Sequence, residues 1–376
     1  MKDITQVLQV MCEHKASDMF CTPDNPISIK VNGITRALTT ESLEPGETRE
    51  LIYSLMTDSQ IQEFESEWEL NFAFEKAGLG RFRANVFRQR GQVAMVVRFL
   101  ANKVPELGAL NMPPMLYDLI LRQRGLVLVV GAAGSGKSTT IASLLEYRNL
   151  HDRGHILTIE DPIEYRLLHQ NCVINQREVG VDTKSFERAL QNTLREAPDV
   201  LFIGEIRTPE VMRQVLSYAD TGMLVVSTLH ANSADQALDR IIGFFPETVR
   251  EQVLADLSMV LQAIISQRLV KDKRGQRLPA VEVLLNTAHI AELIRTGKLS
   301  EVKQAMKTHM YPGMMTFDDS LYQLYLDDRI TGEEALLHAD SRTDLSLKIK
   351  LTGSAEADEP ETLQPVNPYL DNHGMA

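Results

Sequence analysis

Apolar and polar residues alternate with a period of two along much of the first part of the chain, which predicts half-buried β-strands. Residues 47–64 and the N-terminal stretch instead place their apolar residues at helical spacing, with Ile4, Val7 and Leu8 on one helix face. Strands and helices mixed in this way predict a small α+β domain. The strands expected there are 26–31, 34–38, 70–75, 81–87 and 92–99.

Beyond about residue 116, short apolar runs alternate with amphipathic segments of helical period. This pattern is typical of a mostly parallel, doubly wound α/β sheet. Residues 248–269 carry an apolar stripe that predicts one long helix, and the chain from 288 to about 351 is expected to be helical. The other expected strands are 126–130, 156–159, 200–203, 224–228 and 281–285, with helices near 138–149, 185–196, 209–219 and 233–242.

Composition supplies the remaining boundaries. Pro105, Gly108 and two further prolines crowd the segment between the two patterns, where neither helix nor strand fits. From Thr352 onward the chain contains acids but no Lys or Arg, which predicts disorder. The predicted organisation is an N-terminal domain over 1–104, an interdomain linker over 105–115, a second domain over 116–350 and an acidic disordered tail over 351–376.

Charge and cysteine usage exclude several classes of protein. The formal net charge is −12, from 39 basic and 51 acidic residues, so no nucleic-acid partner is expected. The chain has no apolar run of about 18 residues and no signal sequence at its N-terminus. Its three cysteines are scattered and form no CxxC pair, which argues against both disulfides and zinc. A cytoplasmic protein is therefore expected.

The clearest chemical motif follows the apolar run 126–130. Its spacing, Gly-x4-Gly-Lys-Ser, is that of a phosphate-binding P-loop, whose backbone N–H groups and following helix attract phosphate. Lys137 is expected to reach the β- and γ-phosphates of ATP, and the Ser138 hydroxyl to bind Mg²⁺. The expected nucleotide-binding residues are Gly131, Ala132, Ala133, Gly134, Ser135, Gly136, Lys137, Ser138 and Thr139.

Acidic residues follow two of the predicted strands, at the strand ends where ligands bind in α/β sheets. Glu160 or Glu164 is expected to orient the attacking water or accept its proton, with Asp161 nearer the Mg²⁺ shell. After strand 200–203, Gly204 stands where an aspartate commonly sits, so Glu205 is expected to hold the metal or a metal-bound water.

Two further groups of residues each allow two interpretations. His230 follows the strand 224–228 and is either a γ-phosphate sensor or an ordinary hydrogen-bonded histidine. Five arginines crowd the predicted meander. They form either a solvated sheet face or a basic face aimed at the nucleotide of a neighbouring subunit. These arginines are Arg81, Arg83, Arg88, Arg90 and Arg98.

Taken together, these motifs resemble the PilT/PilU family of type IV pilus retraction ATPases, within the secretion-superfamily ATPases. The resemblance covers residues 1 to about 350, and the stretches 177–200, 229–246 and 281–287, with the acidic tail, are most similar to the PilU branch. The segments that carry it are GAAGSGKST (131–139), ILTIEDPIEY (156–165), INQREVG (174–180), ALQNTLREAPDVLFIGEIR (189–207) and TLHANSADQALDRIIGFFP (228–246).

The resemblance implies a PAS-like N-terminal domain before a RecA-like P-loop ATPase domain, assembled as a homohexameric ring with Arg83 and Arg98 as arginine fingers. It implies an ATPase that drives pilus retraction and twitching motility, beside a PilT-like retraction ATPase and an inner-membrane pilus platform protein. Two alternatives stay open. One is an accessory ATP-binding ring with little hydrolysis of its own. The other is a pilus-assembly or type II secretion ATPase, although those commonly carry a four-cysteine zinc insertion that this chain lacks.

One residue departs from the family pattern. A histidine usually follows the Thr-Gly pair that opens the last motif, and here Met223 follows Thr221-Gly222. Methionine is only a weak hydrogen-bond acceptor. The polar relay from nucleotide to ring interface is therefore expected to be incomplete, which bears on the rate of ATP hydrolysis rather than on ATP binding.

Overall fold

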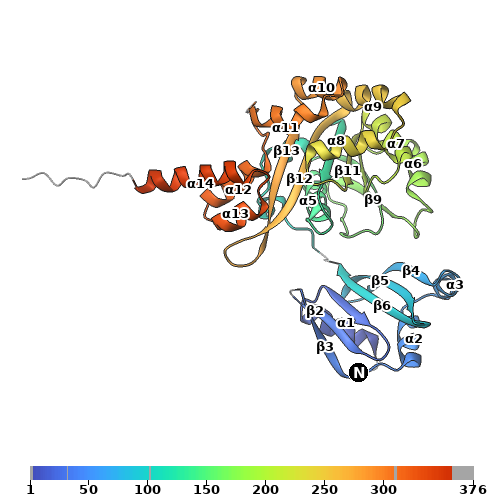
Figure 1. Ribbon diagram of the computed structural model, residues 1–376. Helices are drawn as coiled ribbons and strands as arrows, with labels where there is room; N and C mark the ends of the chain where they lie inside the picture. The colour runs from blue at the N-terminus through green and yellow to red at the C-terminus, as the bar shows by residue number, and fades with distance from the viewer. Residues whose placement is uncertain (1–2, 32, 101–102, 309–310, 358–376) are drawn as a thin grey trace, which may run out of the picture.

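The computed structural model describes residues 3–31, 33–100, 103–308 and 311–357. Two β-sheets organise these residues, and the N-terminal sheet lies below the second one in Figure 1. Each sheet has helices packed against it. Among the described residues, no helix is long and apolar enough to span a membrane.

The N-terminal sheet has six strands in the order β3-β2-β1-β6-β5-β4, and every neighbouring pair is antiparallel. All five strands expected here are confirmed, whereas the short central strand β1 was not predicted. In the register of β5 with β6, Arg83 lies directly opposite Arg98. The elements are α1 (Ile4–Glu13), β1 (Asp18–Cys21), β2 (Pro26–Val31), β3 (Ile34–Ser42), α2 (Pro45–Tyr53), α3 (Asp58–Glu67), β4 (Glu69–Lys76), β5 (Gly80–Gln89) and β6 (Gln92–Leu100).

The second sheet has seven strands in the order β13-β12-β7-β11-β10-β8-β9. All neighbours are parallel except the edge pair β12–β13. The predicted doubly wound α/β class is therefore confirmed. Its strands are β7 (Gly125–Val130), β8 (Gly154–Glu160), β9 (Cys172–Glu178), β10 (Val200–Ile203), β11 (Leu224–Leu229), β12 (Leu261–Lys271) and β13 (Arg277–Leu285).

Strand β7 shows why this sheet forms, because its six residues are all buried and alternate between two cores. Leu126 and Leu128 face one core and Val127 and Val129 the other. A strand buried on both faces reads as a continuous apolar run. The helices that supply these cores are α4 (Met115–Ile120), α5 (Lys137–His151), α6 (Phe186–Glu196), α7 (Pro209–Asp220), α8 (Ala234–Gly243), α9 (Glu247–Val260), α10 (Ala288–Arg295) and α11 (Leu299–Thr308).

The long helix expected over 248–269 is wrong. Helix α9 ends at Val260, and the chain continues directly as β12, between β7 and β13. The run around Ile264 and Ile265 is apolar on consecutive positions because both faces of this strand are buried. Its apolar residues matched a helical period by accident, since a short apolar run fits either structure.

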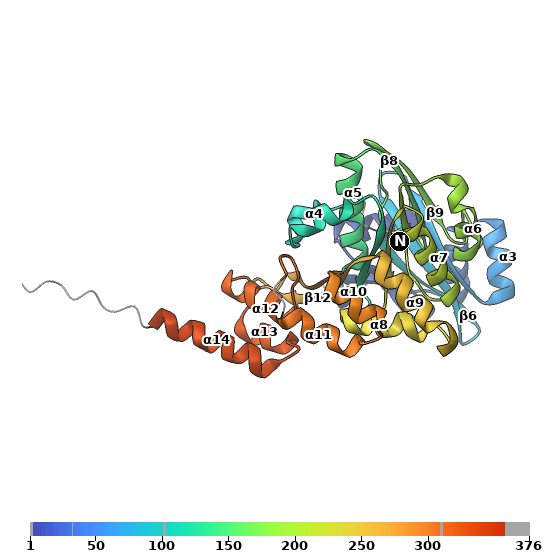
Figure 2. The same ribbon diagram turned by 90° about the horizontal axis from the view of Figure 1, so that it is seen from above.

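The C-terminal part is helical as expected, and α12 (Phe317–Leu326), α13 (Gly332–His338) and α14 (Arg342–Ala357) lie together at one side of the second sheet (Figures 1 and 2). Because α14 runs to Ala357, disorder predicted from residue 351 is wrong up to that point. The rest of the predicted tail, 358–376, lies outside the described residues. In the predicted linker only one short 3₁₀ turn, η1 (Leu107–Leu110), precedes α4.

Candidate functional site

The predicted phosphate loop joins β7 to α5, and its glycines are required by its shape. Gly136 has φ +90° and ends the loop immediately before α5, in the left-handed region that favours glycine. A Cβ atom there would lie 2.7 Å from Nε2 of Gln267 on β12. Gly131 is equally confined, because its Cβ would meet the Ser135 hydroxyl and the Gln267 carbonyl. Only glycine allows this close wrapping of the backbone.

Two polar side chains of the loop are placed for an anion. The Lys137 ammonium donates to the carbonyl oxygens of Gly131 and Ala132, both at 2.9 Å. Burial lowers the pKa of Lys137, and the negative charges of Glu205 and Glu164 oppose that effect. The Ser135 hydroxyl is buried and has no hydrogen-bond partner among the described residues. A phosphate would satisfy both groups.

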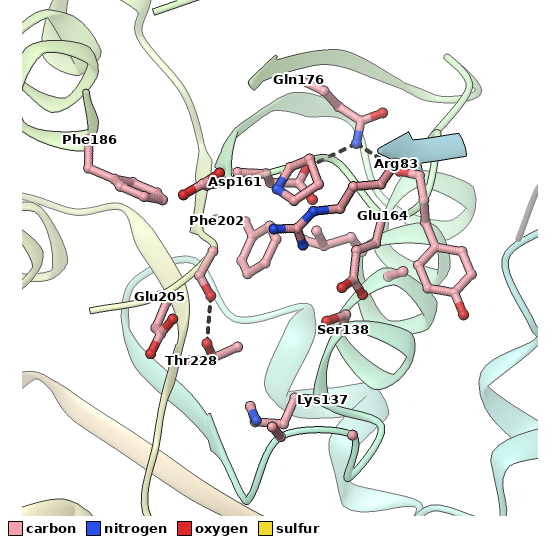
Figure 3. Close-up of a pocket in the computed structure, with 18 of the residues that line it drawn as sticks. Arg83, Lys137, Ser138, Asp161, Glu164, Gln176, Phe186, Phe202, Glu205 and Thr228 are labelled. Carbon is pink, nitrogen blue, oxygen red and sulfur yellow. Dashed lines mark hydrogen bonds between the residues drawn. The ribbon is translucent and has the colours of Figure 1, made fainter. Parts of the chain in front are cut away.

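The loop borders a cleft of about 330 Å³, which reaches the size usual for small-molecule sites (Figure 3). The predicted residues that line it come from both sheets and four strand ends. Gly131, Ala132, Ser135, Gly136 and Thr139 complete the loop without lining the cleft. The predicted residues that line it are Arg83, Arg98, Ala133, Gly134, Lys137, Ser138, Glu160, Asp161, Glu164, Glu205 and His230.

Glu205 follows β10 and is held by two partners. His230 Nε2 lies 3.0 Å from one carboxylate oxygen, and Arg207 Nε donates to the other at 2.8 Å. The turn before Glu205 is fixed by Thr228, whose hydroxyl donates to the Gly204 carbonyl at 2.5 Å. Gly204 itself lies so close to β8 that a Cβ would be 3.4 Å from the Glu160 Cα. Close packing of β10 on β8 therefore accounts for glycine at this position.

The three carboxylates after β8 have different surroundings. Glu160 is buried and accepts hydrogen bonds from Thr158 at 2.6 Å and Gln176 at 3.1 Å. Burial raises the pKa of Glu160 to about 7. Asp161 is exposed and lies 3.7 Å from Arg207. Glu164 turns its carboxylate into the cleft toward Ser138 (Figure 3).

The arginines of the N-terminal sheet divide into separate groups. Arg83 reaches into the cleft from β5 (Figure 3), and Arg98 lines it from β6 while its Nε donates to Asp18 at 2.9 Å. Arg81 instead pairs with Glu178, and Arg88 pairs with Glu65. Arg83 and Arg98 therefore line the cleft of their own chain. Delivery to a neighbouring subunit stays a prediction.

Carboxylates alone do not complete a metal site here. Among the described residues, no group of three or more His, Cys, Asp or Glu side chains is arranged to hold a metal ion. Ser138, Asp161 and Glu205 all line the cleft. Hard oxygen donors of this kind suit Mg²⁺, which commonly takes only one or two protein carboxylates and fills its shell with phosphate oxygens and water. The donor set therefore fits Mg²⁺ only together with a phosphate ligand.

Comparison with known proteins shows the family. The family model described as "Type II/IV secretion system protein" matches residues 1–316. The chain belongs to this family. It is 48% identical to the type IV pilus ATPase PilU of Pseudomonas aeruginosa, over 96% of this chain and 95% of the relative. The type IV pilus retraction ATPase PilT of the same organism is 40% identical, over 89% and 97%.

The solved structures agree with this family assignment. The crystal structure of the pilus retraction motor PilT with bound ADP superposes with a TM-score of 0.85 at 42% identity, covering 92% of this chain and 99% of that one. The ATPase DotB of Yersinia pseudotuberculosis gives a TM-score of 0.74 at 27% identity, covering 91% and 92%. The RecA-like α/β fold predicted for the second sheet is thereby confirmed.

Met223, where this family member departs from the expected pattern, does not reach the cleft. It lies just before β11, is buried in the core, and its carbonyl accepts from the Gly125 N–H at 3.0 Å. Thr228 is five residues further along the strand, roughly 17 Å away at the usual rise per residue. The structure therefore does not bring Met223 together with the other predicted site residues.

Several residues of the site were not predicted. Gln176 and Thr228 lie within motifs that the sequence revealed, but neither is charged and neither stood out. Gln267 could not be found because its strand was read as a helix. Its Oε1 accepts from the Thr140 hydroxyl at 2.8 Å, directly behind the phosphate loop.

The next residue of β12 connects other parts of the chain. Arg268 donates to the carbonyl of Asn232, after His230, at 3.4 Å and to that of His338 in α13 at 3.0 Å. It also pairs with Asp340 at 2.7 Å. Its guanidinium lies 3.8 Å from the ring centroid of Phe317. Strand β12 thus contacts the phosphate loop, the His230 loop and the C-terminal helices.

Proposed function

We propose that this chain is an ATP-hydrolysing motor that drives retraction of type IV pili and so twitching motility, as a PilU-type companion of a PilT-like ATPase. One observation carries the proposal: Lys137, Glu164, Glu205 and His230 face one cleft beside a phosphate loop. The cleft lies in a chain that matches PilU and PilT over nearly their whole lengths.

The phosphate loop binds the triphosphate of ATP. Its backbone N–H groups and the start of α5 supply partial positive charge, and Lys137 exchanges its two loop carbonyls for phosphate oxygens. The unpartnered Ser135 hydroxyl supports this assignment, because a buried donor without a partner costs free energy until a ligand arrives. Mg²⁺, when bound at Ser138 and near Asp161 and Glu205, neutralises charge that develops on the phosphates.

Glu164 and Glu205 act on the attacking water. Glu164 projects into the cleft, whereas Glu160 is buried and occupied by two hydrogen bonds, so we assign the water-orienting role to Glu164 and a supporting role to Glu160. His230 holds one oxygen of Glu205 and fixes the direction of the other. Movement of His230 as phosphate leaves would change the hold on Glu205, which makes it a sensor of the nucleotide state.

We further propose that six copies form a ring, with the N-terminal sheet as a PAS-like domain over 1–104 and the segment 105–115 as its hinge. Arg83 and Arg98 stabilise negative charge on the phosphates when that domain closes. Such a ring would work on the cytoplasmic side of the inner membrane, attached through the pilus platform protein. Contact with the PilT-like partner is part of the same proposal.

A second candidate is an accessory ring with little hydrolysis of its own. It is supported by the higher identity to PilU, 48%, than to PilT, 40%. The two candidates differ in one measurable property, the ATP turnover of the purified chain without a partner.

The test compares ATP turnover with nucleotide binding in matched variants. Lys137→Ala should abolish binding of a fluorescent ATP analogue, and Glu205→Gln should bind it normally while turnover falls about a hundredfold or more. Glu210→Gln removes an exposed carboxylate nearby and serves as the control. Undiminished turnover in Lys137→Ala would refute the nucleotide site. Pilus retraction unaffected by deletion of the gene, in strains with and without the PilT-like partner, would refute the motor role.

A further inference from the structure

The N-terminal sheet and the second sheet are joined by an ion pair with one nearly buried partner. Arg81 on β5 pairs with Glu178, the last residue of β9, and their side chains are 25% and 4% exposed. A second pair between the two sheets, Glu75 with Arg166, is longer at 3.9 Å and well exposed on both sides. Removing one partner of a buried pair leaves an uncompensated charge, whereas exposed pairs contribute little. Arg81–Glu178 is therefore the stronger connection of the two.

Glu178 also holds the loop that carries the predicted catalytic acids. The carboxylate oxygen that pairs with Arg81 accepts a hydrogen bond from the Ile163 backbone N–H at 3.1 Å. The next N–H along the chain, that of Val179, donates to the Glu160 carbonyl at 2.8 Å. Residues 160–163 are thus fixed at two points by the end of β9. Asp161 lies within this segment, and Glu164 follows it directly.

Arg81 has a corresponding position on the other side of the contact. Side chains two apart in a strand point to the same face, so Arg81 and Arg83 leave β5 in the same direction. Arg83 lines the cleft, and Arg98 lies directly opposite it on β6. The Arg81–Glu178 pair therefore sets the separation between the arginines of one sheet and the acid loop of the other.

We infer that Glu178 is a positioning residue, and that docking of Arg81 onto it aligns the 160–164 loop for ATP hydrolysis. When the N-terminal sheet moves away, Glu178 loses its cation and its carboxylate is drawn toward water, which loosens the hydrogen bond to Ile163. Turnover is thereby linked to domain closure. This inference rests on the proposed ATPase function and adds a link between the domains to it.

Neither Arg81 nor Glu178 is among the described residues that line the cleft. Nucleotide binding by the phosphate loop should therefore survive the loss of the pair. The expected signature is a fall in kcat with little change in nucleotide affinity. A general loss of folding would instead lower both together.

The experiment is a double-mutant cycle on the full chain with Arg81→Gln, Glu178→Gln and the double variant. Glutamine at 178 keeps an oxygen for the Ile163 N–H but removes the charge. Each single variant should lower kcat by about tenfold to a hundredfold, the usual effect of small misalignment. The double variant should be no slower than the slower single variant. Arg81→Lys should recover part of the activity, because it keeps the charge.

Two controls separate the inference from simpler outcomes. Removing the exposed pair with Glu75→Gln and Arg166→Gln should leave kcat unchanged. Hydrogen–deuterium exchange of the Ile163 amide gives a readout that needs no activity, and Arg81→Gln should speed it about tenfold, although Arg81 is distant in sequence.

The possible results are distinct. If the losses of the single variants multiply in the double variant, or if nucleotide affinity falls in proportion to kcat, the inference is wrong. Unchanged exchange at Ile163 in Arg81→Gln also overturns it, and this holds even if Glu178→Gln fails to fold. If the unaltered chain shows no turnover with or without its partner, the ATPase proposal fails, whereas the exchange result still decides the link between Arg81 and the loop.

Discussion

Glu160 offers a test of how the buried side of the site is built. The change Glu160→Gln keeps the shape of the side chain and an oxygen that can accept from Thr158 and Gln176. It removes a carboxyl group whose pKa is raised from 4.5 to about 7 by burial. At 1.36 kcal/mol per pKa unit, this rise corresponds to about 3 kcal/mol of differential stability. Solvent screening reduces this figure little, because the residue is only 9% exposed.

The sign follows from the proton count. The folded state holds its proton on Glu160 more tightly than the unfolded state, so this stabilising contribution is complete below pH 4.5. It is lost progressively as the pH rises through about 7. The unaltered chain should therefore lose about 2–3 kcal/mol of unfolding free energy from this group between about pH 5 and pH 8. The glutamine variant should not show this loss.

The assay is urea unfolding followed by far-ultraviolet circular dichroism, without nucleotide or divalent ions, at several pH values in this window. Glu251→Gln removes an exposed acid from α9 and is the matched control. The difference between Glu160→Gln and the unaltered chain should grow with pH in favour of the variant. If the two chains show parallel pH dependence, the reasoning about burial of Glu160 is refuted.

Other predictions concern the loop, the arginines and Met223. Gly136→Ala should weaken ATP binding about tenfold or more, because φ +90° and contact with Gln267 both oppose a Cβ, and isothermal titration measures this. Arg83→Ala should reduce turnover about a thousandfold while ATP still binds, whereas the same change at the turn residue Arg90 should not. Met223→His should lower the melting temperature by burying an imidazole but leave ATP turnover within about twofold, since residue 223 lies at the far end of β11. A rise in turnover there would restore the polar-relay interpretation.

The sequence predicted those parts of the fold in which a local pattern and a local structure agree. The run 126–130 followed by the glycine-rich loop could be read directly, because the P-loop spacing requires a strand before it and a helix after it. Strand β12 could not, because Ile264 and Ile265 are buried by neighbours that only the tertiary fold provides. Strand β1, only four residues long, is too short to show a period.

The same division applies to the site. Charged residues at strand ends, such as Glu205 and His230, were predicted because strand ends converge in this class of fold. Their pairing at 3.0 Å, and the burial that separates Glu160 from Glu164, depend on side-chain directions that no spacing encodes. Glu178 was part of a motif, but its two contacts come from segments far away in the chain.

Strand β12 has a practical consequence for shortening the chain. Gln267 supports the phosphate loop, and the adjacent Arg268 depends on the His338 carbonyl and the Asp340 carboxylate for its position. Cutting the chain before α13 would remove both partners and leave a half-buried guanidinium beside the strand that backs the nucleotide. The smallest fragment that retains the nucleotide site should therefore extend through Asp340, even though the P-loop lies some two hundred residues earlier.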